Sequence, residues 1–233
     1  MSDSLDVGIL LSPGYCLCDI VGIQTVLGIQ PGANLHLLWK NRETLDAMPT
    51  FPTVPTTTFD ECPDELDVLA VGAIMPDVLA DPEVVEFFGK AARRAKHVIA
   101  VCGGVILAGA AGLLEGKRAT TNFQLLDVLP EVGAIPVAGN EVVRDGNIWT
   151  AGPASASYEV ALLVLAELRG EELARRVELD IQYAPNPPFG TGSPELAGPE
   201  LTAASIAEYG PLSDGARAAL AQLRSATSAA AGH

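Results

Sequence analysis

The sequence predicts an α/β protein with a mostly parallel sheet and helices on both faces. Strand-like apolar runs alternate with segments of helical periodicity, which is the pattern of a parallel sheet covered by crossover helices. One run, 98–101, ends abruptly in Cys102-Gly103-Gly104, and a helical segment of small residues follows at once. The chain has 233 residues, of which 48% are hydrophobic, so it can bury one sizeable core.

The predicted strands are short apolar runs bounded by loop residues. They lie at 7–11, 35–39, 67–71, 98–101, 118–121, 142–144 and 148–151. The Asp145-Gly146 pair predicts a hairpin turn between the last two runs. Segment 44–63 is rich in Thr and Pro without helical periodicity, so we expect short extended pieces there, with a hairpin as one arrangement.

The predicted helices are segments in which apolar residues recur at helical spacing. They lie at about 20–27, 82–95, from the elbow to near 112, 124–128, 157–169 and 171–181. Asp81 is expected to cap the second of these, with Pro82 in its first turn. Residues 184–200 are rich in Pro and Gly and should wrap over the surface, and the Ala-rich segment 201–231 has room for one further helix.

Cys102 is the strongest candidate for chemistry. A strand joined to a helix by one reactive side chain and two glycines is typical of a nucleophile elbow. The tight turn of such an elbow holds the residue at its tip in an unusual backbone conformation. The N-terminal end of the following helix is expected to favour the Cys102 thiolate, since its N–H groups are unpaired and its dipole is positive there. The alternative is a cysteine that only packs in the core.

A thiolate that adds to an unsaturated carbon needs a group that handles protons, and Asp19 is the candidate. It lies between the first strand and its helix, and so at the same carboxyl-end rim as Cys102. Its neighbours Cys18 and Ile20 predict desolvation, which raises the pKa of a carboxyl group. The alternative role for Asp19 is an N-cap of that helix.

Further candidates for the oxyanion and substrate-binding side of the site follow the predicted strands. They are Gly72, Ala73, Gly103, Asn122 and Cys18. The first two end a strand where backbone N–H groups can meet a developing negative charge. The asparagine is placed either to hydrogen-bond a substrate or to turn the chain, and the cysteine either to line the pocket or to pack.

Histidine and metal chemistry are not expected. His36 falls within an alternating strand, His97 begins a strand at the end opposite the elbow, and His233 ends the sequence. A Cys-His-Asp triad and the peptidase chemistry that depends on an imidazole are therefore improbable. The cysteines and histidines show no metal-ligand spacing.

The charge balance argues against nucleic acid as a partner, because the net charge is −15 and the 14 Lys and Arg residues form no extended basic run. The first apolar stretch is short and follows no basic region, so neither a signal peptide nor a membrane span is expected. Four cysteines without framework spacing indicate a reduced, cytoplasmic protein.

Four segments together resemble the DJ-1/PfpI superfamily, and within it the bacterial isocyanide (isonitrile) hydratases. They are KHVIAVCGGVILAGAAGLL at 96–114, GLLEGKRATT at 112–121, VVRDGNIWTAG at 142–152 and QYAPNPPFGTGSP at 182–194. The resemblance implies a flavodoxin-like homodimer with Cys102 as nucleophile and Asp19 as its acidic partner. It also implies a catalytic domain at 1–194 and a partly helical C-terminal extension at 195–233.

The reaction that this resemblance implies is the hydration of an isonitrile. The thiolate adds to the isonitrile carbon, the aspartate shuttles protons, and water releases an N-substituted formamide without a metal or an organic cofactor. Some positions depart from the pattern of the hydratases. They are Gly103 in place of Thr, Asn122 in place of the His of many relatives, Val21 and Ile23 in place of Thr and Pro, and a shorter loop at 71–76.

Three functions therefore stay open, and hydration of a small-molecule isonitrile is favoured. The second is a diverged enzyme whose Cys102 adds to another electrophilic carbon, in a glyoxalase- or hydratase-type reaction or in the synthesis of a specialised metabolite. The third is a non-enzymatic sensor with a redox-sensitive cysteine. A DNA-binding regulator is not expected, because the region beyond Pro194 is short and poor in Lys and Arg.

Overall fold

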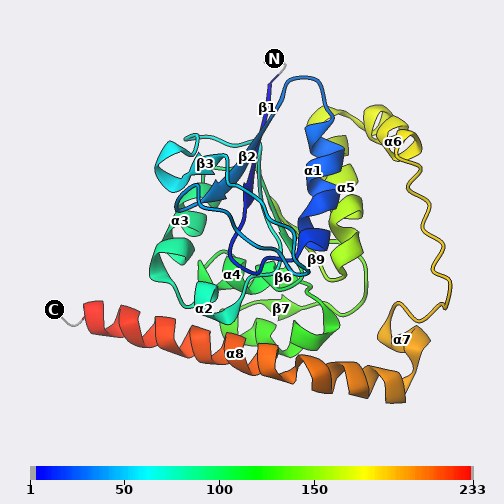
Figure 1. Cartoon of the computed structure of the whole chain (residues 1–233). Coiled ribbons are helices and arrows are strands. Elements are labelled where there is room, and N and C mark those ends of the chain that lie inside the picture. Colours follow the sequence, from blue (N-terminus) through cyan, green and yellow to red (C-terminus); the bar gives the residue numbers. More distant parts are fainter. Residues whose placement is uncertain (1–3, 232–233) are drawn as a thin grey trace.

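The computed structural model describes residues 4–231, with side chains for 4–226. Its centre is a seven-stranded sheet of order β3-β2-β1-β4-β5-β9-β8 (Figure 1). Every neighbouring pair in it is parallel except the β8–β9 hairpin. The strands are β1 (Leu5–Leu10), β2 (Ala33–Trp39), β3 (Thr57–Thr58), β4 (Val68–Val71), β5 (His97–Val101), β8 (Val143–Asp145) and β9 (Ile148–Ala151). The mostly parallel α/β fold is therefore confirmed.

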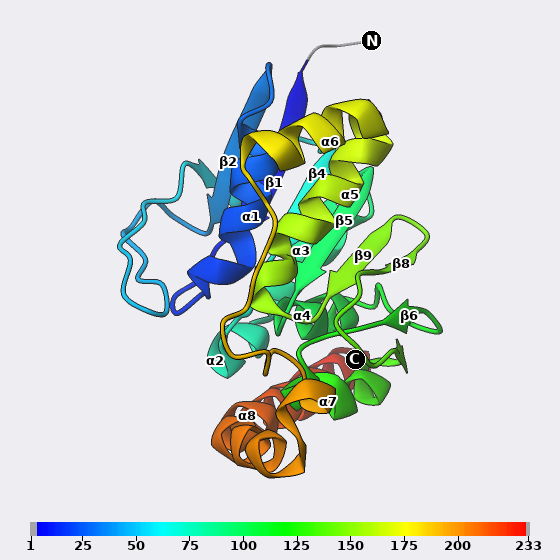
Figure 2. The same cartoon turned by 90° about the vertical axis from the view of Figure 1, so that its right-hand side faces the viewer.

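Helices cover both faces of this sheet (Figures 1 and 2). On one side lie α1 (Leu17–Gly28), α5 (Ser157–Arg169) and α6 (Glu171–Asp180), and on the other lies α3 (Pro82–Ala92). Two short helices, α2 (Pro76–Leu79) and α4 (Gly104–Ala110), begin near the carboxyl ends of the strands. No helix within residues 4–231 is long and apolar enough to cross a membrane.

The central strands are continuous apolar runs because both of their faces are covered. Every residue of β4 and β5 is buried, as is every residue of β9. Phe88 of α3 and Ile23 of α1 pack onto the sheet from opposite sides with no exposed surface. Fully burying such a side chain contributes about 1.5–3 kcal/mol, so the sheet is a rigid base for the loops at its carboxyl end.

Several predicted elements have other bounds in the structure. The strand predicted at 118–121 is only β6 (Arg118–Ala119), which pairs with β7 (Ile135–Pro136) in a separate small sheet. It stops there because the next N–H, that of Thr120, donates to the Thr150 hydroxyl instead of a ladder carbonyl, at 3.0 Å. The helix predicted at 124–128 is a longer 3₁₀ helix, η2 (Phe123–Val132), in which Pro130 cannot donate an α-helical hydrogen bond.

The Thr/Pro-rich segment 44–63 is extended as predicted only up to β3, because the 3₁₀ helix η1 (Phe59–Glu61) follows that strand. Leu45 and Thr53 form an isolated antiparallel bridge, and β3 pairs with β2 in parallel. Asp81 caps α3 by accepting a hydrogen bond from the Glu83 N–H, but α3 ends at Ala92 and not at residue 95.

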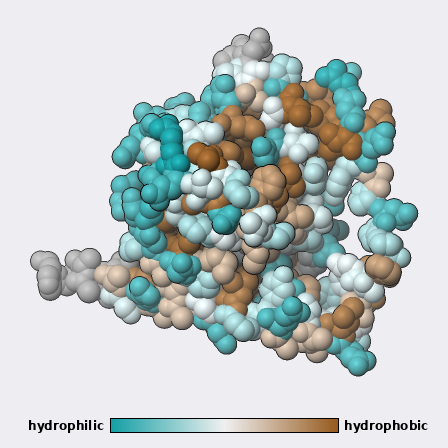
Figure 3. Space-filling model, viewed as in Figure 1, coloured by the Kyte–Doolittle hydropathy of each residue, from teal (hydrophilic) through white to brown (hydrophobic). Residues whose placement is uncertain are grey.

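The C-terminal segment crosses the carboxyl end of the sheet. After α6 the chain runs down the right-hand edge of the molecule in Figure 1, and across the front in Figure 2, to α7 (Pro194–Ala197) and then to α8 (Pro199–Ala231). Ala216, Ala219 and Leu220 of α8 are buried against the body. The helix forms the lower edge of the molecular surface (Figure 3).

Candidate active site

Cys102 lies at a strained turn between β5 and α4. Its φ is +54°, a left-handed conformation that a residue with a side chain rarely adopts. Two hydrogen bonds hold the turn: the Cys102 N–H donates to the Ala151 carbonyl at 2.9 Å, and the Thr121 hydroxyl donates to the Cys102 carbonyl at 2.6 Å. The predicted elbow geometry is confirmed.

The two glycines after Cys102 meet different neighbours. A Cβ on Gly104 would lie 2.4 Å from the carbonyl oxygen of Gly72, so this position requires glycine. A Cβ on Gly103 would lie 3.4 Å from the Cβ of Ala73, which is an ordinary contact. Gly104 therefore lets α4 approach the end of β4, whereas Gly103 has room for a Cβ.

Asp19 is fully buried in the first turn of α1. Its Oδ2 accepts a hydrogen bond from the Ala73 N–H at 2.7 Å, and a Cβ on Gly72 would lie 2.6 Å from the Asp19 Cβ. Its Oδ1 has no hydrogen-bond partner among the described residues. A buried oxygen without a partner is uncommon in folded proteins and is a candidate for a functional atom.

The alternative role of Asp19 as an N-cap is not observed, because α1 begins earlier than predicted and its N-cap is Cys16. Burial raises the pKa of Asp19 to about 6, against the lowering effects of the Ala73 N–H and the Cys16 thiol. The predicted desolvation is therefore confirmed. A carboxyl group with this pKa exchanges protons near neutral pH.

The expectation of a resting Cys102 thiolate is wrong. Burial, and then the negative charge of Asp19, raise the pKa of Cys102 well above its ordinary value. The Gly103 N–H lowers it, as a helix N-terminus should, but this effect is smaller than the cost of desolvating the thiolate. Cys102 and Asp19 therefore interact electrostatically, with the cysteine as the protonated partner at neutral pH.

Cys102 opens into a cavity of about 310 Å³. The cavity is lined by residues from the elbow, η2, the loops after β7 and β9, and the C-terminal segment. They are Cys102, Thr121, Asn122, Phe123, Gln124, Leu126, Ala138, Gly139, Asn140, Gly152, Pro153, Ala154, Gly192, Pro194, Glu195 and Tyr209. This volume is at the small end of ligand pockets.

Three of the other predicted positions border a space beside Cys102, and the fourth contacts Asp19. Asn122 lines the Cys102 cavity, and Gly103 and Ala73 border a second, small apolar space that also adjoins Cys102. The Ala73 N–H is occupied by Asp19, so it holds the acid and is not a free oxyanion donor. Gly72 provides the close approach to Asp19.

Cys18 is exposed and does not line the Cys102 cavity. Its carbonyl accepts a hydrogen bond from the Ser157 hydroxyl at 2.9 Å. Cys16 is the cysteine that interacts electrostatically with both Asp19 and Cys102. Cys16, the N-cap of α1, is thus the cysteine near Asp19 and Cys102, instead of the predicted Cys18.

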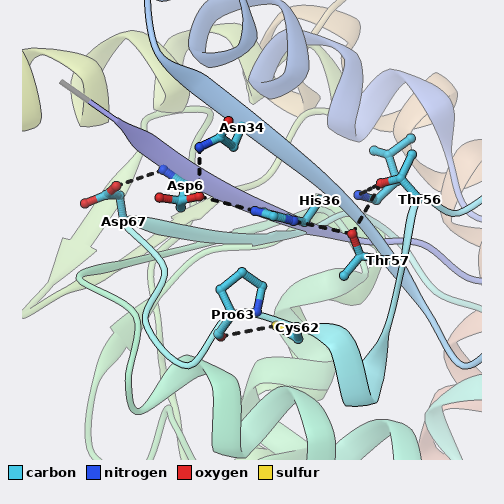
Figure 4. A network of polar contacts seen from close by, with 9 residues as sticks. Asp6, Asn34, His36, Thr56, Thr57, Cys62, Pro63 and Asp67 are labelled. Atoms are coloured by element: carbon cyan, nitrogen blue, oxygen red, sulfur yellow. Dashed lines mark hydrogen bonds and ion pairs between the residues drawn. The ribbon is translucent and has the colours of Figure 1, made fainter. Parts of the chain in front are cut away.

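The histidines in the described part of the chain have structural roles. Figure 4 shows His36 on β2 between Asp6 and Thr57, at 3.3 Å from each. His97 accepts a hydrogen bond from the Trp149 indole at 3.2 Å, at the start of β5 and so at the end opposite Cys102. Sequence reasoning missed Thr121 and Tyr209, because nothing in their local sequence links either residue to Cys102.

A cysteine at a strained strand–helix turn, beside a buried carboxylate on a parallel sheet, defines the class of α/β proteins with a cysteine nucleophile elbow. The sequence profile of the DJ-1/PfpI family matches residues 6–167. The chain belongs to the DJ-1/PfpI family.

Individual relatives agree with this assignment. The chain is 42% identical over 196 residues to an isonitrile hydratase of Pseudomonas putida, covering 83% of this chain and 85% of the relative. A ThiJ/PfpI family protein from Pseudomonas syringae superposes with a TM-score of 0.89 at 32% identity, covering 93% of this chain and 90% of that one. Drosophila melanogaster DJ-1beta shares the fold, with a TM-score of 0.67 at 19% identity over 78% of this chain and all of its own.

Proposed function

We propose that the protein hydrates isonitriles to N-substituted formamides, with Cys102 as the nucleophile and Asp19 as the proton carrier. The observation that carries the proposal is the fully buried Asp19, whose Oδ1 has no hydrogen-bond partner within the described part of the chain and whose charge acts on the Cys102 thiol. Support for the substrate comes from the 42% identity to the Pseudomonas putida isonitrile hydratase over most of both chains.

The first step joins the sulfur to carbon. Asp19, ionised above a pKa of about 6, accepts the thiol proton as Sγ attacks the terminal carbon of R–N≡C. The electron pair that develops on this carbon then takes the proton back from Asp19. The product is a thioimidate, Cys–S–CH=N–R, and Asp19 is ionised again.

The second step uses water. Water adds to the thioimidate carbon, the nitrogen gains a proton, and the tetrahedral adduct expels the sulfur. Sγ takes back a proton, and R–NH–CHO leaves. The sum is R–N≡C plus water giving the formamide, so no oxidant, reductant or cofactor enters the balance.

Membership of the DJ-1/PfpI family also bears on the oligomeric state, location and substrate class of the protein. We propose that the protein acts as a cytoplasmic homodimer on a small uncharged molecule. The cavity suits such a substrate, since Phe123, Leu126 and Tyr209 contribute apolar surface to it.

The test is product formation from an alkyl isonitrile. The wild-type protein is incubated with cyclohexyl isonitrile, and N-cyclohexylformamide is measured by mass spectrometry. Turnover that is lost in Cys102→Ala is the expected result. Full activity of Cys102→Ala contradicts covalent catalysis, and no formamide from a wild-type protein whose Cys102 still reacts with alkylating agents contradicts the isonitrile substrate.

A further inference from the structure

The C-terminal helix α8 borders both spaces that adjoin Cys102. Tyr209 lines the larger cavity, and Leu212 and Ala216 line a second, small apolar space that also adjoins Cys102. These positions are three and four residues apart, so they share one face of the helix. The extension is therefore part of the wall of the site.

Polar contacts hold this face of α8 in place. The Gln124 side-chain amide donates to the Ser205 hydroxyl at 3.1 Å, and Gln124 in turn accepts a hydrogen bond from Asn122 at 3.0 Å. Farther along the helix, Arg217 pairs with Asp127 and Glu131 of η2. The helix is thus fixed to the segment that forms the opposite wall of the cavity.

Close packing adds to these contacts. A Cβ on Gly215 of α8 would lie 2.7 Å from the Pro76 ring of α2. This glycine lets the helix approach the body, so the position of Tyr209 relative to Cys102 is set by packing on both sides of the site.

Tyr209 is the bulky side chain that α8 presents to the larger cavity. Its hydroxyl makes no hydrogen bond to the described residues, and the residue is 40% exposed, so the ring lies between solvent and the cavity. Burial raises the pKa of Tyr209, so its hydroxyl stays neutral.

We propose that Tyr209 is a specificity-determining residue, which limits the size of the substituent that reaches Cys102. In the proposed hydration, on which this inference rests, the ring contacts the N-substituent of the isonitrile. The favoured substrates carry a compact, uncharged, apolar substituent, because the cavity is small and Glu195 at its rim repels anions.

The test measures alkylation of Cys102, which does not depend on turnover. Rates with iodoacetamide and with the bulkier N-phenylmaleimide are followed at pH 8.5 by peptide mass spectrometry. Tyr209→Ala is expected to raise the ratio of the bulky to the small reagent about tenfold, the effect of opening a pocket by a side chain. Tyr209→Trp is expected to lower that ratio, and Tyr209→Phe to leave it unchanged.

Ile206→Ala is the matched control, because Ile206 is an exposed apolar residue of the same helix that lines neither space. An unchanged ratio in both Tyr209→Ala and Tyr209→Trp overturns the proposal, as does an equal change in Ile206→Ala. If the ratio changes as expected but no isonitrile is hydrated, the proposed function fails and the size limit at Tyr209 stands.

Discussion

The Ala73 N–H donates a 2.7 Å hydrogen bond to Oδ2 of Asp19 and thereby fixes the carboxyl group at the end of β4. The bond uses one oxygen and leaves Oδ1 without a hydrogen-bond partner among the residues that the structure describes. A β-strand end thus orients an acid that belongs to a helix of another part of the chain. This arrangement explains how a carboxylate that is fully buried keeps one atom for chemistry.

Replacing Asp19 by Asn should lower kcat/KM for isonitrile hydration by at least about 100-fold, the usual effect of losing a general acid–base group. The amide oxygen can still accept the Ala73 N–H, so the fold should persist. Asp67→Asn is the control, because Asp67 also accepts a backbone N–H, that of Asp6 at 2.8 Å, at the opposite end of the sheet. A rate for Asp19→Asn close to that of the control would leave Asp19 with only a structural role.

Activity and stability should depend on pH in opposite directions. Because the ionised form of Asp19 accepts the thiol proton, kcat/KM should rise as the pH passes about 6. The folded pKa lies above the unfolded value of 3.8, so the favourable contribution of the protonated form is complete below pH 3.8 and is lost as the pH rises through about 6.

The size of this loss is on the order of 3 kcal/mol, from a shift of roughly two pKa units in a fully buried group. Asp19→Asn removes the titration. Its free energy of unfolding in urea, relative to wild type, should therefore increase between pH 4 and pH 7.5. A difference that does not vary with pH would show that the pKa of Asp19 is not raised.

Cys102 should react slowly with iodoacetamide at pH 7, and its rate should keep rising above pH 9, because its pKa is raised well above the ordinary value. The exposed Cys18 serves as the internal reference in the same peptide digest. A plateau in the alkylation rate of Cys102 below pH 8 would show instead that its pKa is lowered, as expected from the helix N-terminus.

Two adjacent threonines should respond differently to replacement by valine. Thr121→Val removes the 2.6 Å bond to the Cys102 carbonyl and should cost about 1 kcal/mol, with a lower kcat. Thr120→Val should be neutral or stabilising, since the Thr120 hydroxyl is buried and makes no hydrogen bond to the described residues. Thermal unfolding and turnover of both variants test this, and equal effects would remove any special role for Thr121 in the elbow.

The two glycines of the elbow give a similar contrast. Gly103→Ala should change the unfolding free energy by less than about 0.5 kcal/mol, because its Cβ would meet ordinary contacts. Gly104→Ala should cost about 1–3 kcal/mol, because its Cβ would lie 2.4 Å from a backbone oxygen. Chemical denaturation of the two variants measures both unfolding free energies. Tolerance of both substitutions would contradict the close packing of α4 on β4.

The sequence by itself determined the parallel sheet, the elbow at Cys102 and the desolvated acid at Asp19. These are local properties: hydrophobic periodicity, a strand followed by small residues, and the neighbours of a carboxyl group are all read within a few positions. The predicted α5 matches the structure from Ser157 to Arg169, because its helical pattern is long and unbroken.

Tertiary structure alone decided the protonation state of Cys102, since burial outweighs a helix N-terminus whose effect the sequence does predict. It also decided that Cys16 and not Cys18 interacts with the Asp19 side chain, and that Thr121 and Tyr209 line the cavity beside Cys102. Each of these depends on contacts between segments far apart in the chain, which arise only when β4, β5 and α8 converge at one end of the sheet.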